Sequence, residues 1–459
     1  MGKAEDVVIT SQVPSESIPL LGHALPSPTY LSQEEVVQQA GSAPWPGVRK
    51  ALLCLLMALF ACLLALAVLL LVTMPRPRPP LAWWQKASFY HLPPASFPDS
   101  DGDGQGDLEG VRRQLDRLLA LSIQALVLGP ILESDLANLS RILPAHGSQE
   151  QLEALVDVGK KEGLRILLEL PVWQEEMDPS AKHNQTHRRL KGAFQFWQAL
   201  GIHGFLVGKD PAWRLEAVLD AWSELGAETK PDRGQEKVLI VRDESEICNI
   251  SCRVPDSVIL SCRLLGAERN LTAQGLAQRV EGALGHPRVP WPGWMVRRDL
   301  VPWGPPLKAG LGEMLGVLQL TLPGVPLLQG GEGSPVPLQN ESTEGSSDRP
   351  LLENLHRSLL VLHASSFALH GVDYIPLPLA GNSDDVFAFL RPGSCSAILV
   401  VLNLGPRPLQ LSLSQLNFLV PAKVLFSTHP EPQRESNVDR VRLAPHQAVL
   451  LQVPRGRGQ

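Results

Sequence analysis

The sequence has no large excess of charge of either sign. Its 41 Lys and Arg residues stand against 47 Asp and Glu residues, which gives a formal net charge of -6 over 459 residues. Proteins that bind nucleic acid usually carry a basic patch or stripe that neutralises phosphates. Because this balance provides no such footprint, nucleic acid is not an expected partner.

One stretch, residues 51–73, lacks charged residues and proline altogether and consists almost wholly of Leu, Ala and Val. It is long enough to cross the hydrocarbon core of a bilayer as one helix, which needs about 20 apolar residues. A cleaved signal peptide is excluded, because 50 residues precede the run and a Pro/Arg-rich segment follows it in place of a small-residue cleavage site. A buried core helix is the alternative, but the uninterrupted run favours an uncleaved transmembrane signal-anchor.

Glycosylation sequons indicate on which side of the membrane the rest of the chain lies. Charge does not decide it, because two basic residues flank each end of the apolar run. No sequon precedes the run, whereas five follow it, at Asn138, Asn184, Asn249, Asn270 and Asn340. This one-sided distribution predicts a single-pass type II glycoprotein with a lumenal or extracellular body.

The tail, residues 1–50, is then cytoplasmic. It is poor in aromatic residues and rich in Ser, Pro and Gln, so it is expected to be mostly disordered. Glu16, Leu20 and Leu21 match an acidic dileucine sorting signal, which would send the protein through endosomes. So short a pattern arises by chance at least as readily, and both interpretations stay open.

Cysteine is scarce, with six residues in the chain. Cys54 and Cys62 lie inside the apolar run, where they are expected to be small apolar fillers. The other four face an oxidising compartment and allow three pairings. They are Cys248, Cys252, Cys262 and Cys395. The spacing of Cys248 and Cys252, with Cys262 beyond, could suggest zinc, but no histidine lies at ligand spacing, so we favour disulfides among these four.

Residues 99–107, Asp-Ser-Asp-Gly-Asp-Gly-Gln-Gly-Asp, form the most specific local motif. Carboxylates at alternate positions, with glycines that let the backbone fold back, direct several oxygens to one hard cation, and about seven oxygens suit Ca²⁺. An EF-hand is not expected, because the twelfth position is Gly110 rather than glutamate. We expect a structural calcium loop of another kind, with a solvated acidic turn as the alternative. The candidate ligands are Asp99, Asp101, Asp103 and Asp107.

A neck, residues 74–86, joins the apolar run to the body. Its first half is rich in Pro and Arg and contains no cysteine. Two tryptophans, Trp83 and Trp84, follow. They would either sit at the membrane surface or pack on the body.

Beyond the neck, short apolar segments alternate with segments of helical spacing. Strands are predicted at residues 125–130, 165–170, 204–207 and 238–241. Such alternation requires a parallel sheet covered by helices, and the length favours a (β/α)8 TIM-type barrel over residues 87–370. Residues 371–459 show strands separated by turn residues without helices, which predicts an antiparallel β-sandwich.

Several stretches resemble the α-amylase family of glycoside hydrolases. Residues 96–110, around the acidic loop, are similar to the opening of that family, and residues 321–332 are similar to its eighth-strand signature. The apolar run, its N-terminal flank and the body together resemble 4F2-type heavy chains, the heavy subunits of heteromeric amino-acid transporters. The resemblance covers the chain from about Leu31 to its end. It implies a barrel and a β-sandwich on a single span beside a multi-span carrier, and a cation in the acidic loop.

The resemblance to the α-amylase family does not extend to its catalytic residues. A retaining glycosidase needs a carboxylate nucleophile and a second carboxyl group about 5 Å away as acid/base. The family's fourth-strand motif, Gly-Phe-Arg-x-Asp, falls on residues 204–208, so the nucleophile position is Gly208. The acid/base position falls near Asp243 and the third carboxylate near Asp299. Without a nucleophile no covalent intermediate forms, so we expect no glycosidase activity.

Two functions are therefore weighed. The favoured one is a non-catalytic heavy subunit at the plasma membrane, which contacts lipid and a multi-span amino-acid transporter light chain, stabilises that carrier and brings it to the surface. The resemblance implies a disulfide to the carrier just outside the membrane, but the neck has no cysteine, so the association is expected to be non-covalent. The alternative is a membrane-tethered glycosidase-like protein that binds carbohydrate or has weak α-glucosidase activity.

Overall fold

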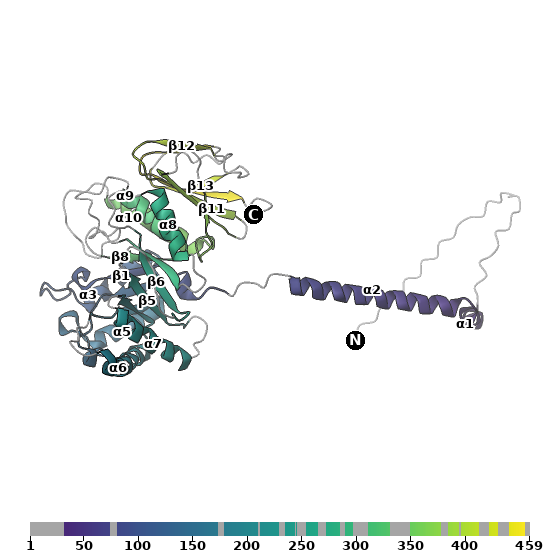
Figure 1. Ribbon diagram of the computed structural model, residues 1–459, viewed down its shortest axis with the longest axis horizontal. Coiled ribbons are helices and arrows are strands. Elements are labelled where there is room, and N and C mark those ends of the chain that lie inside the picture. Colours follow the sequence, from purple (N-terminus) through teal and green to yellow (C-terminus); the bar gives the residue numbers. More distant parts are fainter. Residues whose placement is uncertain are drawn as a thin grey trace, which may run out of the picture. The chain divides into compact units, whose positions relative to one another are not determined.

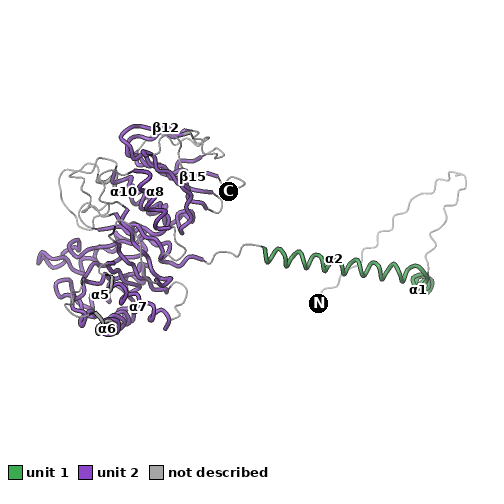
Figure 2. The backbone as a smooth tube through the Cα atoms, viewed as in Figure 1, with its two compact units in different colours: residues 1–79 green, residues 80–459 purple. Residues whose placement is uncertain are grey.

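The computed structural model describes most of the chain from Ser32 onward. The described residues are 32–73, 80–172, 179–209, 212–228, 235–243, 245, 254–264, 272–284, 290–296, 311–330, 349–377, 384–393, 396–412, 422–429 and 440–454. They divide into two compact units, residues 1–79 and residues 80–459 (Figure 2).

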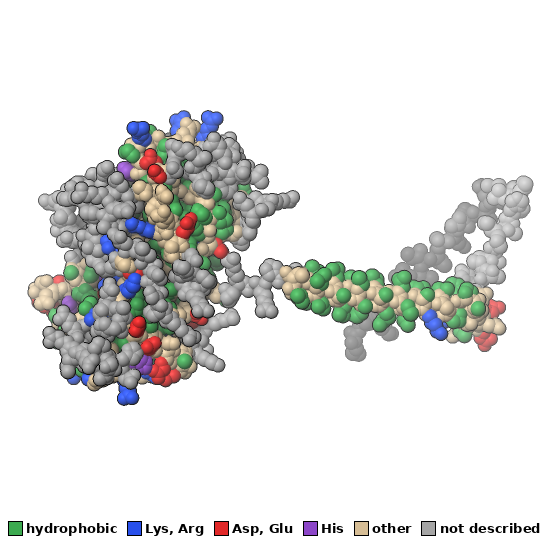
Figure 3. Space-filling view, viewed as in Figure 1, with side chains coloured by type: hydrophobic (Ala, Val, Ile, Leu, Met, Phe, Trp, Pro, Cys, Tyr) green, Lys and Arg blue, Asp and Glu red, His purple; other side chains and the backbone are tan. Residues whose placement is uncertain are grey.

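The first unit contains a short helix, α1 (Gln33–Gly41), and a long apolar helix, α2 (Trp45–Thr73). Ser32 and Glu35 form a capping box at the start of α1, which satisfies two backbone N–H groups. The 29 residues of α2 extend over about 43 Å. Among the described residues it is the one helix long and apolar enough to span a membrane, and apolar side chains cover its visible side (Figure 3).

α2 begins six residues before the apolar run predicted from the sequence. Pro46 is compatible with this earlier start, because the first turn of a helix does not need the backbone N–H that proline lacks. Arg49 and Lys50 then continue the same helix. The charged flank is therefore helical, and the predicted run is its apolar part.

The second unit contains a closed barrel of eight parallel strands in sequence order, which confirms the predicted (β/α)8 architecture (Figure 1). The strands are β1 (Phe89–Leu92), β2 (Ala125–Leu128), β3 (Arg165–Glu169), β4 (Gly204–Gly208), β5 (Val238–Asp243), β6 (Val258–Arg263), β7 (Trp291–Met295) and β8 (Val325–Gln329). The helices are α3 (Leu108–Arg113), α4 (Leu115–Ala120), α5 (Gln149–Glu162), α6 (Pro179–Ala199), α7 (Ala212–Glu228), α8 (Ala273–Leu284), α9 (Leu311–Thr321) and α10 (Arg349–Ser365).

Alternation along each strand separates the barrel interior from the layer beneath the helices. Phe89, Leu167 and Ile240 belong to one buried cluster, whereas their strand neighbours pack in a second cluster with the helices. Because successive side chains of a strand point to opposite faces, residues two positions beyond an interior residue also point inward. This rule identifies which side chains fill the barrel at the carboxyl ends of the strands.

Trp83 and Trp84 close the opposite, amino end of the barrel. Both are buried, and their rings contact residues at the starts of strands: Trp83 packs on Phe89, and Trp84 packs on Trp291. The guanidinium of Arg165 lies 4.4 Å from the Trp83 ring centroid. Of the two placements open from the sequence, the tryptophans therefore take the one on the body, and the chain enters the barrel at its amino end.

The C-terminal region consists of two antiparallel sheets, as expected. The larger has the order β13-β15-β11-β10-β9, and the smaller pairs β12 with β14. The strands are β9 (Ile375–Pro376), β10 (Val386–Arg391), β11 (Ser396–Asn403), β12 (Leu409–Ser412), β13 (Lys423–Ser427), β14 (Arg440–Leu443) and β15 (Ala448–Pro454). Side chains of both sheets share one apolar cluster, which includes Leu399 and Leu451 from the larger sheet and Val441 from the smaller.

Candidate functional site

Three charged or polar side chains meet inside the barrel at the carboxyl ends of its strands. His91 ends the interior row of β1, Glu169 ends that of β3, and Arg242 ends that of β5. His91 Nε2 lies 2.6 Å from Glu169 Oε2, and Arg242 Nη1 lies 2.8 Å from Glu169 Oε1. Both carboxylate oxygens of Glu169 are thus paired within the barrel mouth.

The pKa of Glu169 reflects two opposing effects. Burial alone raises the pKa, because it penalises the charged form. The hydrogen bond and the charge of His91, together with the charge of Arg242, outweigh burial and leave the pKa below its ordinary value. Glu169 is therefore a carboxylate at neutral pH, and its oxygens are paired with His91 and Arg242 rather than open to a substrate.

Gly208, the position of the family's nucleophile, lies at the carboxyl end of β4 in register with Arg242. An added Cβ at Gly208 would meet no atom within 4 Å. The mouth therefore keeps room for a side chain at this point, although the sequence supplies none. The inward position beside it on β5 carries the guanidinium of Arg242, which cannot serve as the second carboxyl group that a retaining glycosidase needs.

Asp243 does not belong to the inward row. It follows Val241 in alternation, and Val241 packs in the cluster beneath the helices. The buried carboxylate accepts a hydrogen bond from Lys209 Nζ at 2.9 Å and hydrogen bonds from the hydroxyl and backbone N–H of Ser245. Burial raises the pKa of Asp243, but these hydrogen bonds outweigh it and the net pKa is lowered. The sequence assigned the acid/base position near Asp243, whereas the geometry places that residue in a lysine–serine contact outside the interior row.

Sequence reasoning did not single out the His91–Glu169–Arg242 group. The alternation of side chains along β5 could have identified Arg242. It follows Ile240 by two residues and Val238 by four, and because both of these point into the barrel, Arg242 points inward as well. A charged residue in an otherwise apolar inward row marks the end of the packed interior. Asp299, the third expected carboxylate, lies outside the described residues.

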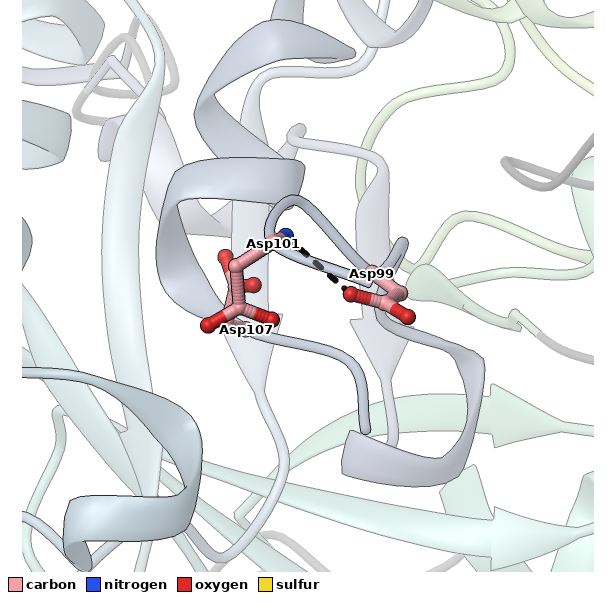
Figure 4. Close-up of side chains that lie close together, drawn as sticks. All are labelled: Asp99, Asp101 and Asp107. Carbon is pink, nitrogen blue, oxygen red and sulfur yellow. Dashed lines mark hydrogen bonds between the residues drawn. The ribbon is translucent and has the colours of Figure 1, made fainter. Parts of the chain in front are cut away.

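The acidic loop brings three of its four candidate ligands together. Oxygens of Asp99, Asp101 and Asp107 all lie within 4.8 Å of one another (Figure 4). Asp103 is not part of this group, and its carboxylate accepts a hydrogen bond from the backbone N–H of Gln105 at 2.7 Å. The loop can fold back because Gly102 and Gly104 adopt φ of +85°, a backbone conformation that favours glycine.

Backbone hydrogen bonds favour the charged form of two loop carboxylates, those of Asp99 and Asp107. Asp99 accepts from the N–H groups of Gly102 and Gly104, and these bonds lower its pKa. Burial raises the pKa of Asp107, but hydrogen bonds from Gly110 and Ser100 outweigh it and lower the pKa overall. Asp99 and Asp107 thus offer hard, ionised oxygens at neutral pH, and with the oxygen of Asp101 they form a donor set that fits a divalent cation such as Ca²⁺.

The remaining predicted sites are described only in part. Asn138 ends a 3-10 helix, is partly exposed, and donates from Nδ2 to Asp135 Oδ2 at 3.1 Å. Asn184 falls within α6, and Cys262 on β6 is disulfide-bonded. The other predicted sites lie outside the described residues: Asn249, Asn270, Asn340, Cys248, Cys252, Cys395, Glu16, Leu20 and Leu21.

Some known proteins are similar to nearly the whole chain, and others are similar only to part of the barrel. The profile of the α-amylase catalytic domain matches residues 91–208. Amino acid transporter heavy chain SLC3A2 of Oryctolagus cuniculus is 28% identical over 93% of this chain and 88% of its own length, and that of Mus musculus is 29% identical over 93% and 89%. Maltase A2 of Drosophila melanogaster is 39% identical, but over 23% of this chain and 20% of its own length.

Solved structures agree with the fold. The trehalulose synthase MutB from Pseudomonas mesoacidophila MX-45 superposes with a TM-score of 0.62 at 14% identity, covering 82% of this chain and all of that one. The isomaltulose synthase PalI from Klebsiella sp. LX3 gives the same TM-score at 15% identity and the same coverage. At such low identity this likeness concerns the fold alone. The expected resemblance to transporter heavy chains with an α-amylase-like body is confirmed by the sequence matches.

Proposed function

We propose that this protein is the non-catalytic heavy subunit of a heteromeric amino-acid transporter. The observation that carries the proposal is the extent of the likeness to SLC3A2, which leaves only about 7% of the chain unmatched. That remainder is shorter than the first unit, so the match reaches beyond the barrel toward the membrane helix. The glucosidase-type relatives match a fifth to a quarter of the chain instead.

The physical properties of α2 define what such a subunit contributes. A single helix without charged residues in its apolar part cannot enclose a polar path across the bilayer. The route for the amino acid therefore belongs to a multi-span light chain, and the heavy subunit acts by contact with it. We assign it the role of stabilising that carrier and bringing it to the plasma membrane, with the body outside the cell, the sequons glycosylated and the tail inside.

Absence of catalysis is part of the proposal. Gly208 supplies no nucleophile, and both oxygens of Glu169 are paired with His91 and Arg242. A covalent glycosyl intermediate needs an attacking carboxylate, and the inward row of β4 does not provide one. The acidic loop would hold a structural Ca²⁺ through Asp99, Asp101 and Asp107, where the ion would neutralise three neighbouring charges and fix the loop against α3.

Co-purification of the full chain in mild detergent tests the proposal. Expressed in cells of its own source and isolated through an affinity tag, it should bring down a polytopic amino-acid transporter in near-stoichiometric amount. Depletion of the chain should lower the surface abundance of that carrier and the uptake of its amino acid. A chain that purifies alone, with carrier abundance and uptake unchanged after depletion, would refute the assignment.

An assay with α-glucosides tests the alternative function, a glycosidase-like protein with weak α-glucosidase activity. Turnover above the level of a Gly208→Trp variant, which fills the mouth, would assign the protein to the glycosidase-like class. We expect no difference between the two proteins. Carrier co-purification and sugar turnover are independent readouts, so each hypothesis is tested on its own evidence.

A further inference from the structure

The turn between the barrel and the C-terminal sheets lies beside a cluster of cationic and titratable side chains. This turn, residues 366–371, follows α10 and precedes β9, and we refer to it as the junction turn. His363 stands in the last turn of α10, His370 in the junction turn and Arg391 at the end of β10. We propose that protonation of His363 and His370 opens the junction turn together with the last turn of α10. Acid would thus loosen the connection between the barrel and the C-terminal sheets.

Arg391 fixes the closed position of the junction turn. Its guanidinium is fully buried and donates from Nη2 to the carbonyls of Leu369 at 2.9 Å and Gly371 at 3.0 Å. From Nη1 it donates to the carbonyl of Thr321, the last residue of α9, at 3.3 Å. Carbonyl dipoles at the carboxyl end of a helix stabilise a cation. One side chain of the C-terminal sheets therefore connects the end of α9 with the junction turn.

The junction turn also carries part of the apolar core. Leu369 is buried and belongs to the same cluster as Leu360 of α10 and Phe389 of β10. The backbone N–H of Gly324, just before β8, donates to the carbonyl of Gly371 at 2.8 Å. Opening of the turn therefore exposes Leu369 and breaks contacts that involve both the barrel and the C-terminal sheets.

Hydrogen bonds determine where an added proton would enter the two histidines. His363 Nδ1 lies 3.0 Å from the carbonyl oxygen of Leu320, and His370 Nε2 lies 2.8 Å from that of His363. Because a carbonyl oxygen only accepts, both of these nitrogens already carry a hydrogen. A further proton would enter at the opposite nitrogens, Nε2 of His363 and Nδ1 of His370. His363 Nε2 is buried and has no hydrogen-bond partner within the described part of the chain, so a proton there would lose its hydration without compensation.

The charges that act on the two imidazoles are positive. Arg391 acts on both rings, and the exposed ammonium of Lys86 acts on His370. Among the residues that the structure describes, neither imidazole forms an ion pair with a carboxylate, and Asp373 acts on Arg391 instead. Burial, with these neighbouring charges, lowers the pKa of both histidines, to about 3 for His363. The closed turn therefore keeps both rings neutral.

Proton uptake favours the open turn. Once the turn opens, the histidines reach solvent and bind protons below their ordinary pKa of about 6.5. For His363 alone, a change from pH 7.5 to pH 5 multiplies the equilibrium constant for opening by about 30, and His370 adds to this factor. This interval includes the pH at which histidine clusters act as switches in other proteins.

Amide hydrogen exchange of the full chain in mild detergent tests the proposal. Exchange of a peptide that covers residues 362–372 is followed at pH 7.5 and at pH 5, with correction for the intrinsic pH dependence of exchange. We expect its protection to fall by about 30-fold or more at pH 5, while the protection of α5 changes by less than about threefold. The chain is measured without a carrier, so the result does not depend on the transporter assignment.

Two substitutions identify the groups that take up the protons. His363→Gln and His370→Gln each remove one titrating ring, and a smaller pH response of the 362–372 peptide in either variant supports the proposal. His187→Gln is the matched control, because His187 on α6 pairs with Glu224 of α7, and the response should be unchanged. If His363→Gln fails to fold, His370→Gln and the native chain still provide the comparison.

Three results would overturn the proposal. The first is equal protection of the 362–372 peptide at both pH values in the native chain. The second is a fall at pH 5 that α5 shares, which would indicate loss of the whole fold rather than local opening. The third is a local fall of the same size in the native chain and in both junction variants, which would assign the proton uptake to other groups.

Discussion

His91 Nε2 lies 2.6 Å from Glu169 Oε2, although the two residues belong to strands that are not neighbours in the barrel. The contact spans the barrel mouth above β2, and Arg242 completes it from β5. A buried carboxylate held by an arginine and a hydrogen-bonded histidine stabilises the fold most while it is ionised. This hydrogen-bonded group thus occupies part of the mouth, while the position of Gly208 beside it stays open.

The first prediction concerns Glu169. Glu169→Gln removes the charge that pairs with His91 and Arg242, and it should lower the free energy of unfolding at neutral pH by about 2–3 kcal/mol. Because the pKa of Glu169 is below its ordinary value in the folded state, the stabilisation exists above the unfolded pKa and is lost as pH falls through the folded one. Denaturant unfolding in mild detergent, followed by tryptophan fluorescence, measures the difference.

Glu109→Gln is the matched control for that variant. Glu109 pairs with Arg112 and Arg113 at the surface, where solvent screens the interaction, so little change is expected. Equal effects of the two substitutions, or an effect of Glu169→Gln that stays constant down to pH 3, would contradict a buried ion-pair role.

Two glycines on the same inward face of β4 provide a second prediction. A Cβ at Gly204 would collide with the backbone carbonyl of Val238, whereas a Cβ at Gly208 would meet nothing within 4 Å. Gly204→Ala should therefore destabilise the fold by about 3 kcal/mol or more, and Gly208→Ala should change stability by about 0.5 kcal/mol at most. Melting temperatures of the two variants test this difference in stability. A strongly destabilised Gly208→Ala protein would show that the mouth has no room for a side chain at this point.

Calcium dependence is the third prediction. If the acidic loop holds Ca²⁺, adding the ion at about 100 times its dissociation constant should stabilise the folded chain by about 2.7 kcal/mol, and a chelator should reverse the effect. Asp101→Asn should abolish the calcium-dependent part, while Asp135→Asn, in a separate 3-10 turn, should keep it. Identical melting of the native chain with calcium and with chelator would leave the solvated acidic turn as the correct interpretation.

The fourth prediction concerns pH and His363. This fully buried histidine on α10 faces the carbonyl of Leu320 through Nδ1 at 3.0 Å, and burial lowers its pKa from 6.5 to about 3. The folded state therefore keeps it neutral while the unfolded state takes up a proton below about pH 6.5, so stability falls as pH drops toward 3. Between pH 6.5 and pH 5 the loss should be about 2 kcal/mol.

His363→Gln separates this contribution from others. Glutamine retains a donor for the Leu320 carbonyl but does not titrate, so its stability should decline less over the same pH interval. The test compares unfolding free energies of the two proteins at pH 6.5 and pH 5. Parallel curves would assign the acid sensitivity to other groups, among them His203, whose pKa burial also lowers, to about 4.

The fifth prediction concerns the link to the proposed carrier. The neck contains no cysteine, and Cys54 and Cys62 are free thiols within α2. The heavy and light chains should therefore separate on a denaturing gel without reductant. A band of the combined mass that disappears only on reduction would contradict non-covalent association.

The order of elements could be predicted from residue patterns because it depends on local chemistry. The apolar run had to be a membrane-length helix or a core helix, and alternating apolar and amphipathic segments had to be a parallel sheet with covering helices. The replacement of the nucleophile by Gly208 is likewise a property of one position in one motif. Each of these features can be predicted from residues that are close together in the sequence.

Tertiary structure alone decided which side chains enter the mouth. A shift of one residue at a strand end moves a side chain from the interior to the layer beneath the helices, so the sequence could not determine whether Asp243 or Arg242 points inward. The same holds for Trp83 and Trp84, whose burial depends on the open amino end of the barrel, and for Asp103, which lies outside the group that Asp99, Asp101 and Asp107 form. These outcomes depend on contacts between distant segments, which form only when the barrel closes.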